Sequence, residues 1–100
     1  MDITKTTNGC TLEIKIAGRL ESLTAPQLDA EIKGLPAEIK ELIMDISEME
    51  YTSSAGLRVF LSAHKLLKSR GGAMKVRGVT PSVKKLFDLT AFTPILNFID

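Results

Sequence analysis

Alternation of apolar and polar residues marks the first strands of this chain. Thr11–Ile16 alternates cleanly, and the apolar residues that share one face are Leu12, Ile14 and Ile16. We expect Gly18 to end this strand. A shorter stretch, Ile3–Thr7, precedes it, and Asn8-Gly9 between the two is typical of a two-residue hairpin turn. The two strands are therefore predicted to be antiparallel.

A first helix is predicted to begin after Thr24. This residue is a suitable N-cap, Gln27 follows three residues later at the capping-box position, and Pro26 is tolerated in a first turn. Gly34 and Pro36 indicate where the helix ends. Its apolar stripe comprises Leu28, Ile32 and Leu35.

Two further helices are predicted to alternate with strands. One runs from Ser54 or Ala55 to Ser69, where Gly71-Gly72 stops it, and the other opens with Thr80 as its N-cap. Strands are expected before, between and after these helices, at residues 41–46, 73–79 and 95–99.

The order of elements predicts the fold class. Strands that alternate with helices require right-handed parallel crossovers, whereas the opening hairpin adds an antiparallel pair. The continuous apolar run Leu42-Ile43-Met44 indicates a central strand buried on both faces. We therefore expect one α/β domain over residues 1–100, with a mixed sheet of about four to five strands and three main helices.

Composition agrees with an ordinary globular protein. Apolar residues make up 44% and charged residues 25% of the chain. The single cysteine excludes an internal disulfide and fits a reducing compartment. Neither a signal peptide nor an apolar run of about 20 residues is present. We expect a soluble, cytoplasmic protein without membrane insertion.

Charge differs between the two halves of the chain. Residues 1–50 carry 5 Lys/Arg against 10 Asp/Glu, and residues 51–100 carry 8 against 2, giving −5 and +6. The basic excess could steer an acidic partner, but solvated faces of amphipathic elements explain it more simply. Nucleic acid is disfavoured, because the 5 aromatic residues are not interleaved with the basic ones.

A run of hydroxyl residues, Thr52-Ser53-Ser54, lies where a strand is expected to lead into a helix. The first turn of a helix has unpaired N–H groups and a positive dipole end, so it accepts a capping hydroxyl or a phosphate. Ser54 is therefore either a cap, worth about 1 kcal/mol, or a phosphoacceptor; its spacing alone favours the cap. Asp45 could support the loop by accepting N–H bonds, and Gly56 would allow a close approach of the helix to the sheet or a partner.

Catalysis is not indicated. Ser54 and His64, the only histidine, lie ten residues apart on one helix, which is about 15 Å and beyond hydrogen-bond reach. His64 instead falls at helical spacing beside apolar residues, which favours a buried or half-buried position. One Cys and one His form no metal-ligand pattern, and no phosphate-binding glycine loop is present. We expect no metal, no cofactor and no enzymatic activity.

Taken in order, several short motifs resemble the STAS domain family over nearly the whole chain. The motifs that carry this resemblance are Gly18-Arg19-Leu20-Glu21 with Thr24 and Leu28, Asp45-Ile46-Ser47, Ser54-Ala55-Gly56-Leu57, and Gly78-Val79-Thr80-Pro81-Ser82-Val83. Proteins made of this domain alone resemble anti-sigma factor antagonists, which a serine kinase, often the anti-sigma factor itself, inactivates by phosphorylation. The resemblance implies a non-enzymatic regulator that binds such a kinase, and a serine phosphatase that resets it.

The phosphorylated serine of that family aligns with Ser54. Many members have aspartate where this chain has Ser53, which makes Ser53 an alternative acceptor, and a second hydroxyl residue where it has Ala55. The partner-binding surface expected from the resemblance comprises Thr52, Ser53, Ser54, Ala55, Gly56 and Arg58. An alternative remains open: some small STAS proteins resemble accessory or scaffold subunits of transport ATPases or stress-signalling assemblies, which need no phosphate.

Overall fold

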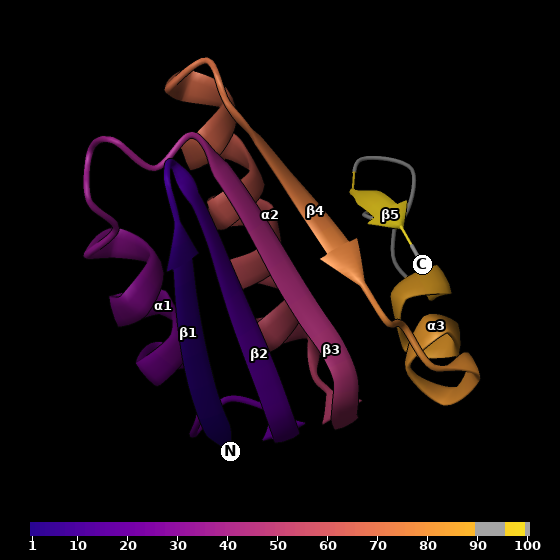
Figure 1. Ribbon diagram of the computed structural model, residues 1–100. Helices are drawn as coiled ribbons and strands as arrows, with labels where there is room; N and C mark the ends of the chain where they lie inside the picture. The colour runs from indigo at the N-terminus through magenta and orange to yellow at the C-terminus, as the bar shows by residue number, and fades with distance from the viewer. Residues whose placement is uncertain (90–95, 100) are drawn as a thin grey trace.

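A computed structural model describes residues 1–89 and 96–99 of the chain. Its elements are β1 (Asp2–Asn8), β2 (Thr11–Leu20), α1 (Ala25–Lys33), β3 (Glu41–Thr52), α2 (Ser54–Ser69), β4 (Ala73–Arg77), α3 (Pro81–Asp88) and β5 (Asn97–Ile99). Within the described residues, five strands form one sheet in the order β1-β2-β3-β4-β5 (Figure 1). β1 and β2 are antiparallel, and every later pair is parallel. The predicted mixed α/β fold with an N-terminal hairpin is confirmed.

The hydrophobic core lies between one face of the sheet and the helices. Alternate residues of the three central strands are buried there: Leu12, Ile14, Ile16, Leu42, Met44, Ile46, Met74 and Val76. The predicted stripe of α1 is buried as well, and α2 runs behind β3 and β4 in Figure 1. Phe87 of α3 links Phe60 of α2 to Phe98 of β5, with ring centroids 5.7 and 5.3 Å apart. The helices therefore pack on the sheet through residues that the sequence pattern identifies as apolar stripes.

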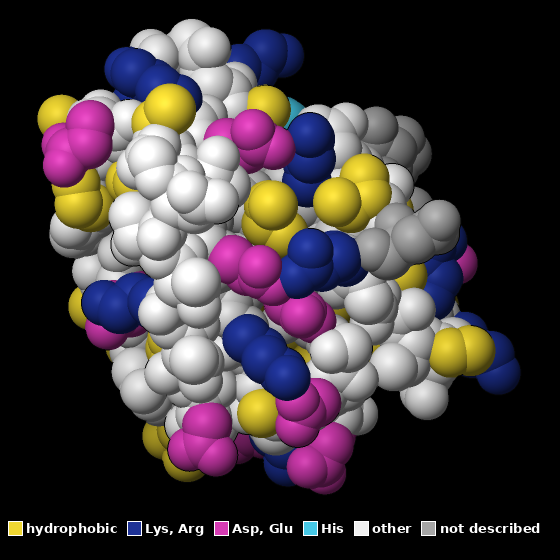
Figure 2. Space-filling model, viewed as in Figure 1, with side chains coloured by type: hydrophobic (Ala, Val, Ile, Leu, Met, Phe, Trp, Pro, Cys, Tyr) yellow, Lys and Arg dark blue, Asp and Glu magenta, His cyan; other side chains and the backbone are white. Residues whose placement is uncertain are grey.

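The opposite face of the sheet remains partly exposed, which corrects the expectation that β3 is buried on both sides. Ile43 lies on this face and is only half-buried. Figure 2 views the face directly and shows acidic and basic side chains interspersed over it. Arg77 of β4 pairs with Glu13 of β2, and Lys75 pairs with Glu41. Since basic side chains of β4 pair with acidic side chains of β2 and β3, this polar face is stable in contact with water.

Two strands run further than the sequence predicts. β2 continues through Gly18 to Leu20, because Gly18 adopts a positive φ of 93° and the pairing with β3 shifts register there. β3 likewise continues to Thr52, beyond its predicted end at residue 46. The extra length of both strands carries the chain to the edge of the sheet from which α2 starts.

The helix boundaries agree with the predictions, but one capping mechanism is wrong. Thr24 is the N-cap of α1 without a side-chain cap bond, so no capping box with Gln27 forms. Thr80 caps α3 as expected, since its Oγ1 accepts from the N–H of Val83 at 3.4 Å. β4 ends at Arg77, short of the predicted Val79. The last strand is confirmed over Asn97–Ile99, whereas its predicted first residue, Ile95, lies outside the described residues.

Candidate functional site

The hydroxyl segment Thr52-Ser53-Ser54 lies at the carboxyl ends of the neighbouring strands β2 and β3. Leu20 of β2 is paired with Thr52 of β3, and the Ser53 N–H donates to the Leu20 carbonyl at 2.9 Å. α2 then begins at Ser54. The start of this 16-residue helix is thus tied directly to the end of the neighbouring strand.

Ser53, rather than Ser54, is the N-cap of α2. It has extended backbone angles (φ −97°, ψ 175°), and its carbonyl accepts from the Leu57 N–H at 3.1 Å. Its hydroxyl makes no capping bond, and Oγ is buried without a hydrogen-bond partner among the described residues. Ser54 is the first helical residue and is exposed. The two adjacent serines therefore differ: the hydroxyl of Ser53 is buried, whereas Ser54 is exposed to solvent.

Gly56 and Thr52 form the support beneath this helix start. A Cβ on Gly56 would lie 2.5 Å from Thr52 Oγ1 and 2.7 Å from Leu20 Cγ. Of the two roles considered for Gly56, the close approach of helix to sheet is therefore the one observed. Thr52 is only 3% exposed, and its hydroxyl donates to the Ser53 carbonyl at 3.2 Å. Both residues lie under the exposed surface, whereas Arg58 is exposed and Ala55 is half-buried.

A turn at the start of α1 places an exposed leucine near the same strand ends, which sequence reasoning missed. Leu23 is 88% exposed. The turn is held by Thr24, whose Oγ1 donates to the Arg19 carbonyl and accepts from the Glu21 N–H, both at 2.9 Å. Because Leu20 leads into this turn and also binds Ser53, the turn and α2 are structurally linked. In the sequence, this exposed position could have been recognised as an isolated leucine between two hydroxyl residues, Ser22 and Thr24.

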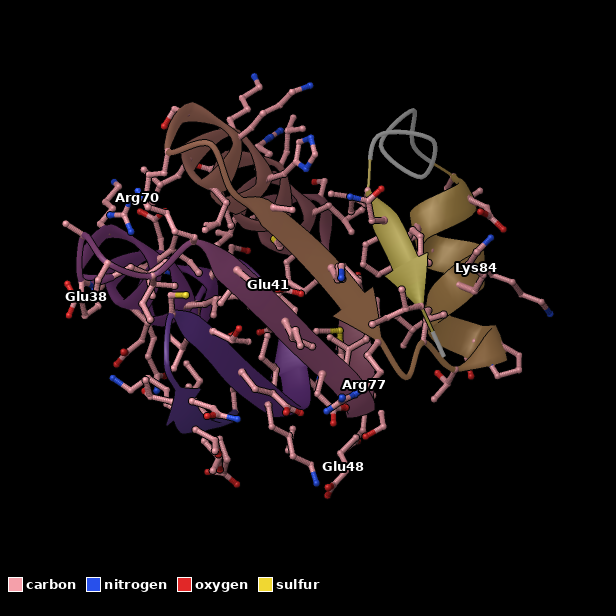
Figure 3. The ribbon with its side chains drawn as sticks, turned by 45° about the horizontal axis from the view of Figure 1, so that its top comes forward. Glu38, Glu41, Glu48, Arg70, Arg77 and Lys84 are labelled. Atoms are coloured by element: carbon pink, nitrogen blue, oxygen red, sulfur yellow. The ribbon has the colours of Figure 1, made fainter. Side chains whose placement is uncertain are left out.

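Asp45 supports a different part of the chain from the one expected. Its Oδ1 accepts from the N–H and the hydroxyl of Ser47, at 3.0 and 2.7 Å. Its Oδ2 lies 3.5 Å from the guanidinium of Arg77, which Figure 3 labels. Gly78 allows the chain after β4 to pass close by, since a Cβ there would lie 2.8 Å from Ser47 Cβ. These bonds hold the irregular stretch of β3 in place, and they do not reach the Thr52–Ser54 segment.

Lys15 and Glu48 form an exposed ion pair between β2 and β3. The hydrogen bond and the charge of Glu48 raise the pKa of Lys15 above its ordinary value of 10.5. Arg19 of β2 lies over the ring of Tyr51, with its guanidinium carbon 4.4 Å from the ring centroid. The Lys15–Glu48 pair joins the middle part of β2 to β3, and the Arg19–Tyr51 contact joins the ends of these strands beside the start of α2.

Within the described residues, neither a histidine nor a group of metal ligands lies beside Ser54. Ser54 and His64 both lie on α2, as expected, and His64 is half-buried towards the other end of the helix. No group of His, Cys, Asp and Glu among the described residues is arranged to hold a metal ion. None of the helices in that part of the chain has the length and apolarity to cross a membrane.

Comparison with known proteins identifies related sequences and folds. The STAS domain family model matches residues 2–100. The anti-sigma-B factor antagonist of Bacillus subtilis is 28% identical over 86 residues, which cover 86% of this chain and 79% of that protein.

Two solved structures have the same fold. An anti-sigma factor antagonist from Mycobacterium paratuberculosis has a TM-score of 0.84 at 20% identity, covering 97% of this chain and 83% of that one. The Bacillus cell fate determinant SpoIIAA in its phosphorylated form has a TM-score of 0.77 at 17% identity, covering 99% and 92%.

Proposed function

Since the chain belongs to the STAS domain family, we propose that it is an anti-sigma factor antagonist switched by phosphorylation of Ser54. In this proposal the unphosphorylated protein binds an anti-sigma factor that has serine kinase activity. Transfer of phosphate to Ser54 releases that partner, and a serine phosphatase restores binding. The chain acts as a binding module in a partner-switching system and does not itself catalyse a reaction.

The observation that carries the proposal is the different exposure of two adjacent hydroxyls. A kinase must bring ATP to the acceptor oxygen, so the acceptor has to be accessible. Ser54 is exposed, whereas Ser53 Oγ is buried. This contrast supports Ser54 over Ser53 as the acceptor, although Ser53 occupies the position at which many family members have aspartate.

The position of Ser54 in the helix explains how phosphorylation can leave the fold intact. A phosphate adds about −1.5 to −2 charges at neutral pH. At the first residue of α2 this charge meets unpaired N–H groups and the positive end of the helix dipole. An anion at such a position stabilises a helix by about 0.3–1 kcal/mol. We therefore expect the phosphorylated protein to be at least as stable as the unmodified one.

The same phosphate would weaken the binding of a partner protein docked over Ser54. Burying a dianion beneath a protein surface without a compensating charge costs several kcal/mol. A loss of about 3 kcal/mol already weakens binding about 150-fold. Exclusion by charge and bulk is thus sufficient for release, and no large conformational change is required.

The partner surface that we propose combines the start of α2 with the neighbouring turn. Ser54, Ala55 and Arg58 supply its exposed part, while Thr52 and Gly56 shape it from below. Leu23 adds an apolar side chain that would be buried on docking. An apolar anchor beside a phosphorylatable hydroxyl would let one surface both bind tightly and be switched off.

The experiment is a phosphopeptide map after incubation with the cognate anti-sigma factor kinase and ATP, followed by calorimetric binding. We expect one phosphate on Ser54, no phosphate in Ser54→Ala, and normal labelling of the matched control Ser53→Ala. Ser54→Ala should bind the anti-sigma factor, whereas the phosphorylated protein should bind about 150-fold more weakly without any loss of thermal stability. Phosphate confined to Ser53, or full binding by the phosphorylated form, would contradict the proposal. No phosphate on the chain after incubation with the kinase would favour the accessory-subunit alternative.

A further inference from the structure

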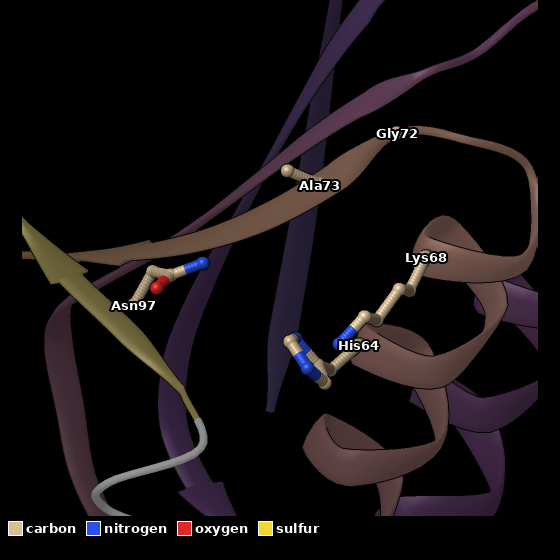
Figure 4. Close-up of a pocket in the computed structure, with 5 residues that line it drawn as sticks. All are labelled: His64, Lys68, Gly72, Ala73 and Asn97. Atoms are coloured by element: carbon tan, nitrogen blue, oxygen red, sulfur yellow. The ribbon is translucent and has the colours of Figure 1, made fainter.

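A pocket of about 470 Å³ lies between the second half of α2 and the strands β4 and β5. Its described lining comprises His64, Lys68, Gly72, Ala73 and Asn97 (Figure 4). The volume falls within the range of about 300–1,000 Å³ that is typical of small-molecule sites. The pocket lies at the opposite end of α2 from Ser54, about 21 Å along the helix from that residue to Lys68.

The fold leaves this space open for a structural reason. β5 pairs with β4 only at Lys75–Arg77, so the first residues of β4 have no paired strand on that side among the described residues. Gly72 lies so close to the carbonyl of Lys40 that no side chain fits there. Main chain and one methyl group therefore border the pocket near the start of β4, and larger side chains enter it only from α2 and β5.

Two side chains of α2 bring hydrogen-bond donors to this pocket. Figure 4 shows the His64 ring and the Lys68 side chain extending from successive turns of α2, and both line the pocket. Lys68 forms no ion pair with any described residue, and no Asp or Glu belongs to the described lining. The helix end does not require Lys68 either, because the N–H groups of residues 70–72 already bind the carbonyls of residues 66–68.

His64 brings one of its two ring nitrogens to this pocket. Its Nδ1 is buried without a hydrogen-bond partner among the described residues, and having no accessible surface it cannot be reached by a ligand. The ring nitrogen that remains for a ligand in the pocket is Nε2. On the far side of the pocket the Asn97 side-chain N–H donates to the Met74 carbonyl at 3.3 Å, which fixes the amide and leaves its oxygen as an acceptor. The lining thus offers hydrogen-bond donors on Lys68 and His64 and an acceptor oxygen on Asn97.

We propose that this pocket binds a small organic anion, whose carboxylate or phosphate group lies between the Lys68 ammonium and the His64 imidazole. The volume exceeds what an inorganic ion needs, so the charged group would be attached to a small organic body. A single exposed lysine provides modest attraction, because water screens it. This inference is independent of the proposed phosphorylation switch, since it concerns other residues and requires no partner protein.

The test uses the fact that the chain contains one histidine, so its imidazole proton signals in an NMR spectrum are unambiguous. Three probes share an aromatic body and differ in their head group: phenyl phosphate, benzoate and uncharged benzamide. We expect both anions, but not benzamide, to shift the His64 signals saturably. The tighter of the two anions identifies the preferred head group.

Variants distinguish a site from general attraction to a basic surface. Lys68→Met should weaken binding of the tighter anion about threefold to fivefold, whereas Lys65→Met, an exposed lysine on the same helix outside the described lining, should not. His64→Gln, followed through the amide signal of Ala73, should also weaken binding. The proposal is wrong if benzamide shifts the signals as much as the anions do, or if neither anion gives a saturable shift. Equal effects of Lys65→Met and Lys68→Met would likewise overturn it.

Discussion

Replacing Gly56 with alanine tests the close packing beneath the start of α2. The added Cβ would lie 2.5 Å from Thr52 Oγ1 and 2.7 and 2.8 Å from Leu20 Cγ and Cδ2. Carbon atoms in contact normally lie about 3.5–4.0 Å apart, so the new methyl group displaces its neighbours. Neither neighbour can turn towards solvent, since Leu20 is 0% and Thr52 3% exposed.

Two effects of opposite sign determine the magnitude. Alanine is favoured over glycine within a helix by about 1 kcal/mol. Forcing an extra methyl group into a packed core costs about 1–3 kcal/mol, and two crowded, buried neighbours indicate the upper end of this range. We therefore expect Gly56→Ala to lower the free energy of unfolding by about 2 kcal/mol. For a domain of this size the midpoint of thermal unfolding should fall by roughly 10 °C.

Urea unfolding of Gly56→Ala, Leu20→Ala and the double variant measures this packing. Leu20→Ala alone should cost about 2–5 kcal/mol, because it leaves a cavity. In the double variant the methyl group added at position 56 occupies part of that cavity, so the combined loss should be smaller than the two single losses together. Ala55→Gly, at the adjacent position, measures by how much this helical turn favours alanine over glycine. Stabilisation by Gly56→Ala, or additivity in the double variant, would refute the argument.

Two further predictions concern exposed side chains, namely the Lys15–Glu48 ion pair and Leu23. Since Glu48 raises the pKa of Lys15 in the folded protein, the pair stabilises the fold below pH 10.5 and loses this effect as the pH rises through the raised pKa. Urea unfolding on either side of that pH should therefore show a loss in the wild type that Glu48→Gln lacks; an equal loss in both would exclude the pair as its cause. Leu23→Ala should leave stability unchanged, because the side chain is 88% exposed, and should weaken anti-sigma factor binding about tenfold in calorimetry. Unchanged affinity would remove Leu23 from the proposed partner surface.

Local pattern was sufficient for most elements of the fold. The alternation of Thr11–Ile16 and the apolar stripe of α1 correspond to observed structure, and the predicted hairpin turn forms one residue later than Asn8-Gly9, at Gly9-Cys10. These signals depend on side-chain period and on the conformations that short segments allow, so they can be read without knowing the rest of the chain. The start of α2 at Ser54 could be predicted from the sequence for the same reason.

Sequence reasoning failed where long-range pairing overrides local signals. Gly18 suggested the end of β2, yet the strand continues because β3 pairs with it beyond a register shift. Ile43 belongs to an apolar run, but it faces a side of the sheet that the described helices leave partly open. Strand length and the burial of a sheet face depend on segments far away in the chain, which a local window does not contain.

At the candidate site, the residue types at the start of α2 could be predicted locally: hydroxyl residues followed closely by a glycine, at a helix end that favours negative charge. Which hydroxyl is available depends on long-range packing. Ser53 and Ser54 are adjacent and chemically identical, but Ser53 is held against the end of β2 with its Oγ buried, while Ser54 is exposed in the first helical turn. The physical reason is packing, since the contact of Gly56 with Leu20 sets how closely the helix approaches the sheet and therefore which side chain remains exposed.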